Sequence, residues 1–354
     1  MRKHVSSSRG SIYTLGQSGT EKSLPLSFNH GKLVNGRGSE ILDTASLTKR
    51  ADKKMIAQKV ILALIDDARK KGMGDWEKSL WNAYRCQQEI ITSEGKVFGK
   101  YCKYRICPIC SNIRKAEKIN DYLPIVDSWS DPHFVTLTVK AVSAKRLDPV
   151  IDSMVKEFRK IKNAYRKREH RGTGKKLIGI RTLECNFNPK NRTYNPHFHV
   201  IVADKEMADT LKREWLRRSK PKWTHPAAQK IRAVKDTERD MIETIKYSAK
   251  ILTEPDPRKE KKDKGPRKVY ISALNNILFA LHGHHVFDRF GFNLPIKKVK
   301  PESRLTHVTD FDSWAYDPSV SDWVNIETGG CLAGFIPEDE IASILRDGLD
   351  MDLQ

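Results

Sequence analysis

The chain has 354 residues, and its 65 Lys and Arg residues against 44 Asp and Glu residues give a formal net charge of +21. Such an excess is typical of proteins that bind a polyanion. No run of about 18 apolar residues could cross a membrane, and residues 1–20 lack the apolar core of a secretory signal. We therefore expect a cytoplasmic protein without a membrane partner.

The first part of the chain is expected to form two segments. Residues 1–45 are rich in Ser, Gly and Lys without apolar periodicity, which predicts a disordered basic segment. Apolar residues at helical spacing over 51–67 predict a helix. Clustered cysteines in a long, Lys-rich chain are typical of metal sites in a reducing compartment, so we expect a helical and zinc-binding segment over 46–125.

Strands and helices alternate after residue 130. Short β-branched runs predict strands at 134–139, 177–187 and 197–203, and helical spacing predicts helices at 147–165, 208–219, 238–252 and 270–281. The Asn- and Pro-rich stretch 188–196 predicts a hairpin-type loop. We expect an α+β domain over 126–255, with a central antiparallel sheet and flanking helices on one side.

The charge of the chain changes sign towards its C-terminus. Residues 256–301 form a basic extension, whereas residues 302–354 hold twelve acidic and two basic residues. A basic body with an acidic tail is typical of a nucleic-acid binder with a separate C-terminal segment. Trp314, Tyr316 and Trp323 within this acidic tail indicate packing or a partner surface.

Two histidines separated by one residue mark the predicted third strand. His197 and His199 should point to the same face, about 7 Å apart, while Phe198 and Val200 point to the other. Two imidazoles so placed can share a divalent ion. The alternative is a pair of partly exposed strand histidines without a ligand.

A carboxylate, a phenol and an ammonium share one face of the predicted helix 238–252. Glu243, Tyr247 and Lys250 follow at spacings of four and three. Tyr247 could act as a nucleophile on a phosphodiester, Glu243 could activate water and Lys250 could balance phosphate charge. The alternative is a solvated charged face with an interfacial tyrosine.

Four cysteines have the spacing of a metal site. Cys107 and Cys110 form a Cys-x2-Cys knuckle that fits tetrahedral Zn²⁺, and Cys102 and Cys86 would complete the set. A redox pair is the alternative, without a thioredoxin-like context to support it. The remaining two cysteines are isolated and are expected to be ordinary thiols.

Basic residues are concentrated in the predicted helix 147–165 and just beyond it. This density favours contact with DNA phosphates over a merely solvated face. The candidate DNA-binding residues are Lys160, Arg166, Lys167, Arg168 and Arg171.

Several of these motifs occur in a particular order. Phe134-Val-Thr-Leu-Thr138, Pro196-His-Phe-His199 and Lys246-Tyr-Ser-Ala-Lys250 resemble motifs of the rolling-circle replication initiators of small plasmids. These initiators belong to the HUH endonucleases, named for a His-hydrophobic-His motif. The chain is most similar to their single-tyrosine group with an upstream glutamate, and Cys102-Lys-Tyr-Arg-Ile-Cys-Pro-Ile-Cys110 resembles that group's cysteine cluster. The resemblance covers roughly residues 84–290.

The resemblance implies an HUH nuclease core and a role for each motif. His197, His199 and Glu184 would bind Mg²⁺ or Mn²⁺. Tyr247 would attack single-stranded DNA at a plasmid replication origin, which leaves a 5′-phosphotyrosine and a 3′-OH that primes a host polymerase. Glu243 would activate water for the terminating cleavage. A host helicase is a further implied partner.

Three other classes share some of these features. A rolling-circle transposase also joins a zinc segment to an HUH domain but typically carries two tyrosines on the catalytic helix. A conjugative relaxase usually has its tyrosine before the histidine motif. A zinc-dependent DNA-binding regulator without enzymatic activity would require the agreement of the motifs to be accidental.

Overall fold

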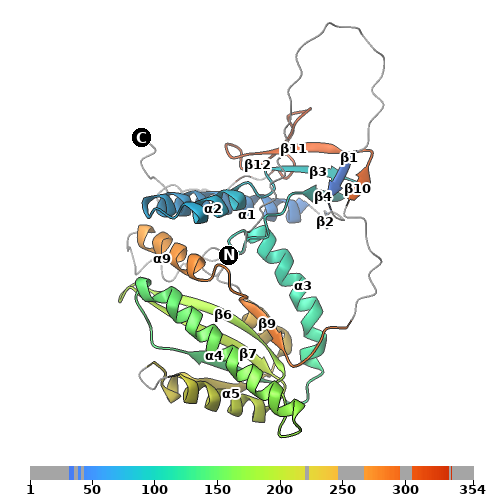
Figure 1. The fold of residues 1–354 in the computed structure, drawn as a ribbon. Helices are drawn as coiled ribbons and strands as arrows, with labels where there is room; N and C mark the ends of the chain where they lie inside the picture. Colours follow the sequence, from blue (N-terminus) through green and yellow to red (C-terminus); the bar gives the residue numbers. More distant parts are fainter. Residues whose placement is uncertain are drawn as a thin grey trace, which may run out of the picture.

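The computed structural model describes residues 32–35, 39–40, 44–219, 223–245, 267–295, 305–334 and 336. The predicted disorder of residues 1–45 falls mostly outside these ranges. Helices and antiparallel sheets alternate through the chain, which confirms the predicted α+β class (Figure 1). Within the described part of the chain, no helix is long and apolar enough to cross a membrane.

A five-stranded antiparallel sheet forms the lower half of the view in Figure 1. Its strand order is β8-β5-β7-β6-β9. The strands are β5 (His133–Thr138), β6 (Gly179–Asn188), β7 (Thr193–Val202), β8 (Lys230–Ala233) and β9 (Phe287–Phe290). The three predicted strands are confirmed, and the last strand comes from residues beyond 255.

The hairpin between β6 and β7 is tighter than predicted. Both strands continue into the stretch 188–196, with Asn188 paired to Thr193 and Cys185 paired to Pro196. The Asn188 side chain accepts hydrogen bonds from the backbone N–H groups of the two residues that follow Pro189. This short polar turn lets the ladder extend almost to its tip.

Two helices cover one face of this sheet, α4 (Ala144–His170) and α5 (Lys205–Arg218). Phe198 of β7 contacts Phe158 of α4 and Trp215 of α5, with ring centroids 5.1 and 5.7 Å apart. All three side chains are essentially fully buried. This aromatic layer forms the centre of the main hydrophobic core.

A third helix, α6 (Thr237–Ile245), lies over the opposite face. Phe134, Ile180 and Ile201 are paired side by side on that face and are buried. Arg232, which pairs with Phe134 in register, binds Asp240 of α6. The expectation of helices on one side is therefore wrong. The strands carry apolar residues on both faces of the sheet, and each face is shielded from water by at least one helix.

The N-terminal half adds a helical layer and a second sheet. The helices are α1 (Thr44–Lys70), α2 (Gly74–Tyr84) and α3 (Pro108–Asp127), and α9 (Arg267–Ala280) packs against both α1 and α4. Asn276 of α9 donates to the Tyr194 hydroxyl of β7, 2.8 Å away. This helix thus joins the N-terminal helices to the first sheet.

The second sheet has the strand order β12-β11-β3-β4-β2. Its strands are β2 (Ser39–Glu40), β3 (Glu89–Ser93), β4 (Lys96–Gly99), β11 (Asp312–Asp317) and β12 (Asp322–Asn325), and a separate pair joins β1 (Lys32–Asn35) to β10 (Leu305–Val308). Tyr316 and Trp323 are buried, so part of the acidic segment packs on the N-terminal half, as its aromatic residues indicated.

Candidate functional site

The described structure brings Glu184, His197 and His199 together on the face of the first sheet that α6 partly covers. We call these three residues the Glu–His cluster. Glu184 of β6 lies directly opposite His197 of β7, and Thr182 lies opposite His199. One carboxylate oxygen and one nitrogen from each ring lie within 4.8 Å of one another. Strand alternation and the antiparallel register are sufficient to produce this grouping.

The orientation of the rings is set by their neighbours. His197 Nδ1 lies 3.0 Å from the backbone oxygen of Asn195, so with Nδ1 protonated this ring presents Nε2 towards Glu184, 3.8 Å away. His199 Nδ1 lies 3.8 Å from the other carboxylate oxygen, and its ring packs edge-on against Phe134 at 5.1 Å. The two rings and the carboxylate thus turn three possible metal-ligand atoms towards one another.

The donor set of the Glu–His cluster fits a divalent metal ion. Two imidazole nitrogens and one carboxylate converge, and their side chains are 7, 12 and 14% exposed for His197, His199 and Glu184. With three protein ligands, a metal ion held here would have coordination positions left for other ligands. Imidazole nitrogens are ligands typical of transition metals, whereas a carboxylate oxygen also suits Mg²⁺ and Mn²⁺, so the donor set does not select one ion.

Helix α6 is held over this face by a bidentate ion pair. The Arg232 guanidinium binds both carboxylate oxygens of Asp240, with one bond of 2.7 Å, and also lies 4.3 Å over the Phe134 ring. The Asp240 carboxylate raises the pKa of Arg232. Glu243 lies on the next turn of α6, whereas Tyr247 and Lys250 lie outside the described residues.

The four cysteines proposed for zinc also come together. We call Cys86, Cys102, Cys107 and Cys110 the cysteine cluster, and their sulfur atoms lie within 4.8 Å of one another. Cys86 follows α2, Cys102 lies in the loop after β4, and the other two lie at the start of α3. Hydrogen bonds from the neighbouring thiols lower the pKa of Cys110. Four convergent thiols, three of them buried, fit a structural zinc site.

A buried lysine beside the cysteine cluster was missed by the sequence analysis. Lys54 of α1 is 2% exposed and donates to the backbone oxygens of Tyr84 and Cys86 at 2.9 and 2.6 Å. Burial lowers its pKa to about 8. Its ammonium lies where it would balance the negative charge of thiolates, but a single lysine in a Lys-rich helix carries no sequence signal for that role.

The predicted DNA-binding residues lie away from the Glu–His cluster. They belong to the exposed surface of α4 and the residue after it, and α4 packs on the opposite face of the sheet. They are Lys160, Arg166, Lys167, Arg168 and Arg171. Any contact that they make with DNA is therefore to a segment other than the one at the Glu–His cluster.

Comparisons with known proteins agree with the motifs. A model of the replication protein family matches residues 96–275, which include the Glu–His cluster and three of the four clustered cysteines. A "Protein rep" from Staphylococcus aureus is 29% identical over 168 residues, 42% of this chain and 69% of the relative. A "Protein rep" from Bacillus sp is 32% identical over 108 residues, 29% of this chain and 33% of the relative.

A longer but weaker match is to a "Protein rep" from Lactiplantibacillus plantarum, 24% identical over 231 residues, 60% of this chain and 69% of the relative. The aligned region thus spans about two thirds of some relatives and a third of others. No solved structure matches the chain.

Proposed function

Because this chain belongs to the replication protein family, we propose that it initiates rolling-circle replication of a plasmid by nicking single-stranded DNA at the replication origin. The observation that carries the proposal is the Glu–His cluster, in which three ligand atoms from two adjacent strands lie within 4.8 Å. Family membership favours this reading over a transposase or a regulator without enzymatic activity.

The Glu–His cluster would hold Mg²⁺ or Mn²⁺, and the ion would polarise the phosphoryl oxygens of the scissile phosphate. Glu184 and the two histidines would position the phosphate against the sheet. Because Phe134 packs against His199 and the backbone of Asn195 orients His197, little rearrangement is needed on binding.

We propose that Tyr247 is the nucleophile. Its phenolic oxygen, after loss of its proton to a base or to solvent, forms a bond to phosphorus, and the bond to the 3′ oxygen breaks. That oxygen takes up a proton and becomes the 3′-OH from which a host polymerase extends the strand. The 5′ end remains linked to Tyr247, and Lys250 would balance the phosphate charge.

Termination requires a second cleavage with one tyrosine already used. Glu243 would deprotonate a water that attacks the second phosphodiester, and the 3′-OH released there would then attack the phosphotyrosine to close the circle. The position of Glu243 on α6, over the face that carries the Glu–His cluster, supports this role. A host helicase would supply the single strand, and zinc in the cysteine cluster would hold the N-terminal half folded.

The test uses a labelled pool of single-stranded oligonucleotides incubated with the full chain and Mn²⁺. We expect a covalent protein–DNA adduct with the wild-type protein and none with Tyr247→Phe, whereas the exposed Tyr270→Phe serves as a matched control that keeps it. His199→Ala should lower adduct formation at least about 100-fold. Adduct formation by Tyr247→Phe at the wild-type rate would refute the assignment, and binding without any adduct would favour the regulator.

A further inference from the structure

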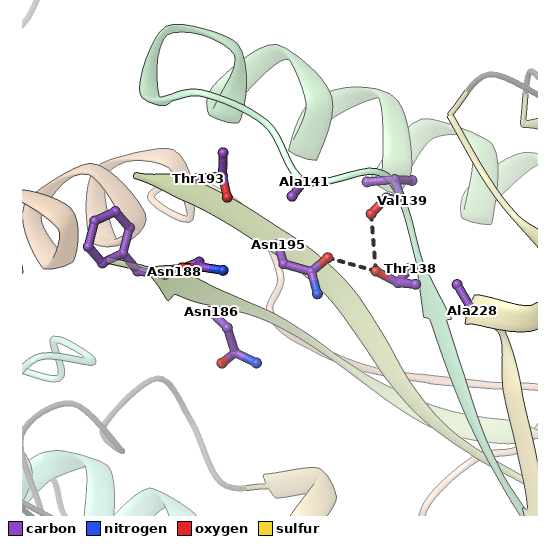
Figure 2. A pocket seen from close by; sticks show the side chains of 9 residues that line it. Thr138, Val139, Ala141, Asn186, Asn188, Thr193, Asn195 and Ala228 are labelled. Carbon is purple, nitrogen blue, oxygen red and sulfur yellow. Dashed lines mark hydrogen bonds between the residues drawn. The ribbon is translucent and has the colours of Figure 1, made fainter. Parts of the chain in front are cut away.

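A hollow of about 420 Å³ opens beside the Glu–His cluster, at the turn end of the β6–β7 hairpin (Figure 2). Asn186 and Asn195 lie on its floor, Thr138 and Val139 form one wall, and Ala228 closes the side towards β8. A volume of this size lies within the range of small-ligand sites.

The hollow continues the same sheet face as the Glu–His cluster. Asn186 is paired with Asn195, and the next pair along the ladder on that face is Glu184 with His197. Two residues along a strand correspond to about 7 Å. A DNA strand with its scissile phosphate at the Glu–His cluster would therefore place a neighbouring nucleotide at the hollow.

The lining of the hollow suits a nucleobase better than a phosphate. It combines amide and hydroxyl groups with the apolar side chains of Val139 and Ala228, and among the described residues that form it none is charged. A phosphate site in a chain with a net charge of +21 would be expected to use Lys or Arg. Amides, in contrast, read the edges of unstacked bases through paired hydrogen bonds.

The wall and floor are held in place before any ligand binds. The Thr138 hydroxyl lies 2.8 Å from Asn195 Oδ1 and 3.2 Å from the Val139 carbonyl oxygen (Figure 2). When the hydroxyl donates to Asn195 Oδ1, the Asn195 amide nitrogen faces the hollow. The buried Gln229 amide accepts from the backbone N–H of Thr138 at 2.8 Å and donates to its carbonyl at 3.2 Å. The Asn188 side chain is already hydrogen-bonded within the turn. Asn186 and Asn195 are therefore the two asparagines whose amides can bind a base edge.

We propose that this hollow binds one nucleobase of the single-stranded DNA next to the scissile phosphate, with Asn195 Nδ2 donating to an acceptor on the base edge and Asn186 offering a second amide. The proposal rests on the proposed function for the identity of the strand. In this proposal, the face of the first sheet selects the base at one position of the DNA strand. The basic surface of α4 has no part in that selection.

The experiment selects from a randomised pool of single-stranded DNA with the full-length protein. One arm sequences the strands cleaved in Mn²⁺, and the other sequences the strands retained in EDTA without cleavage. Asn195→Asp replaces the donating amide nitrogen by an acceptor of the same shape, and Asn186→Ala removes the second amide. Asn191→Ala, an exposed asparagine in the turn of the same hairpin, is the matched control, and melting temperatures verify folding.

We expect Asn195→Asp to change the base preference about tenfold or more at a single position, with all other positions and the Asn191→Ala profile unchanged. A loss of affinity spread over every position, or an unchanged profile for both Asn186 and Asn195 variants, would overturn the subsite. If the wild-type protein binds single-stranded DNA but cleaves none of it, the proposed function is refuted. The strands retained in EDTA then still test the base subsite, because they report base preference without cleavage.

Discussion

The ion pair between Arg232 of β8 and Asp240 of α6 allows a quantitative test of how α6 is positioned. The Asp240 side chain is 7% exposed and the Arg232 side chain is 50% exposed. Arg232→Met removes the guanidinium, and with it the contact over the Phe134 ring, but keeps an unbranched side chain at this position. It leaves the buried carboxylate without its bidentate partner, which costs roughly 1.5–3 kcal/mol per charged hydrogen-bonding group. Exposure of Arg232 reduces the attraction, so we expect a loss of about 2 kcal/mol.

For a chain of 354 residues such a loss lowers the melting temperature by about 3 °C. The double variant Arg232→Met/Asp240→Asn should be destabilised by less than the sum of the two single variants, because the coupling energy belongs to the pair. Arg239→Met, at the neighbouring exposed position of α6, removes the same charge without the bidentate bond and should melt within about 1 °C of the wild type.

The same pair should matter for cleavage, since α6 carries Glu243 and leads to Tyr247. We expect Arg232→Met to slow adduct formation while binding of single-stranded DNA changes little. An unchanged melting temperature for Arg232→Met, or additive effects in the double variant, would refute the view that this pair fastens α6 to the sheet.

Three further predictions concern other parts of the molecule. Cys110→Ser should release bound zinc, measured by metal analysis, and should lower the melting temperature, whereas Cys185→Ser retains the zinc. Glu243→Ala should form the covalent adduct normally but terminate about 10²-fold or more slowly, so gels should show strands longer than one unit; normal termination would contradict the role. Trp323→Phe should cost about 2 kcal/mol in urea unfolding, because it leaves a cavity and removes the 2.8 Å bond to the Gln87 carbonyl.

Local patterns in the sequence predicted the three inner strands of the first sheet, but neither β8 nor β9 at its edges. The β-branched run at residues 134–139 and the alternation around His197 and His199 predicted two central strands, and both are present. Strand alternation also predicted that the two histidines share a face. The roles of these residues in cleavage stay predictions.

The partner of the histidines depended on strand register. Glu184 was selected through the family resemblance, and the length of the intervening loop left its alignment open. The tight turn after Asn188 sets the register that places Glu184 opposite His197. A shift by one residue would have turned the carboxylate to the α4 face.

Pairing between strands that lie far apart in the sequence could not be predicted from local patterns. Strands β3 and β4 are short, and the acidic composition of residues 302–354 concealed β11 and β12. The hydrogen bond from Gln88 to Tyr316 joins residues 228 positions apart, and no period within either segment encodes that contact. The basic residues of α4 were assigned by charge alone, which carries no information about which face of the sheet they occupy.

The pairing of β3 with β11 has a consequence for synthesis on the ribosome. Gln88 and Tyr316 are 228 positions apart, so at about 5–20 residues per second Tyr316 is added some 10 to 45 s after Gln88. During that interval the first sheet can form. The edge of β3 that later pairs with β11 stays unpaired, so its backbone groups can pair with other chains. Nascent chains that stop before residue 305 retain the Glu–His cluster but keep this edge exposed, so we expect truncated products to aggregate or be degraded. The edge of β3 is therefore protected only after β11 has been synthesised.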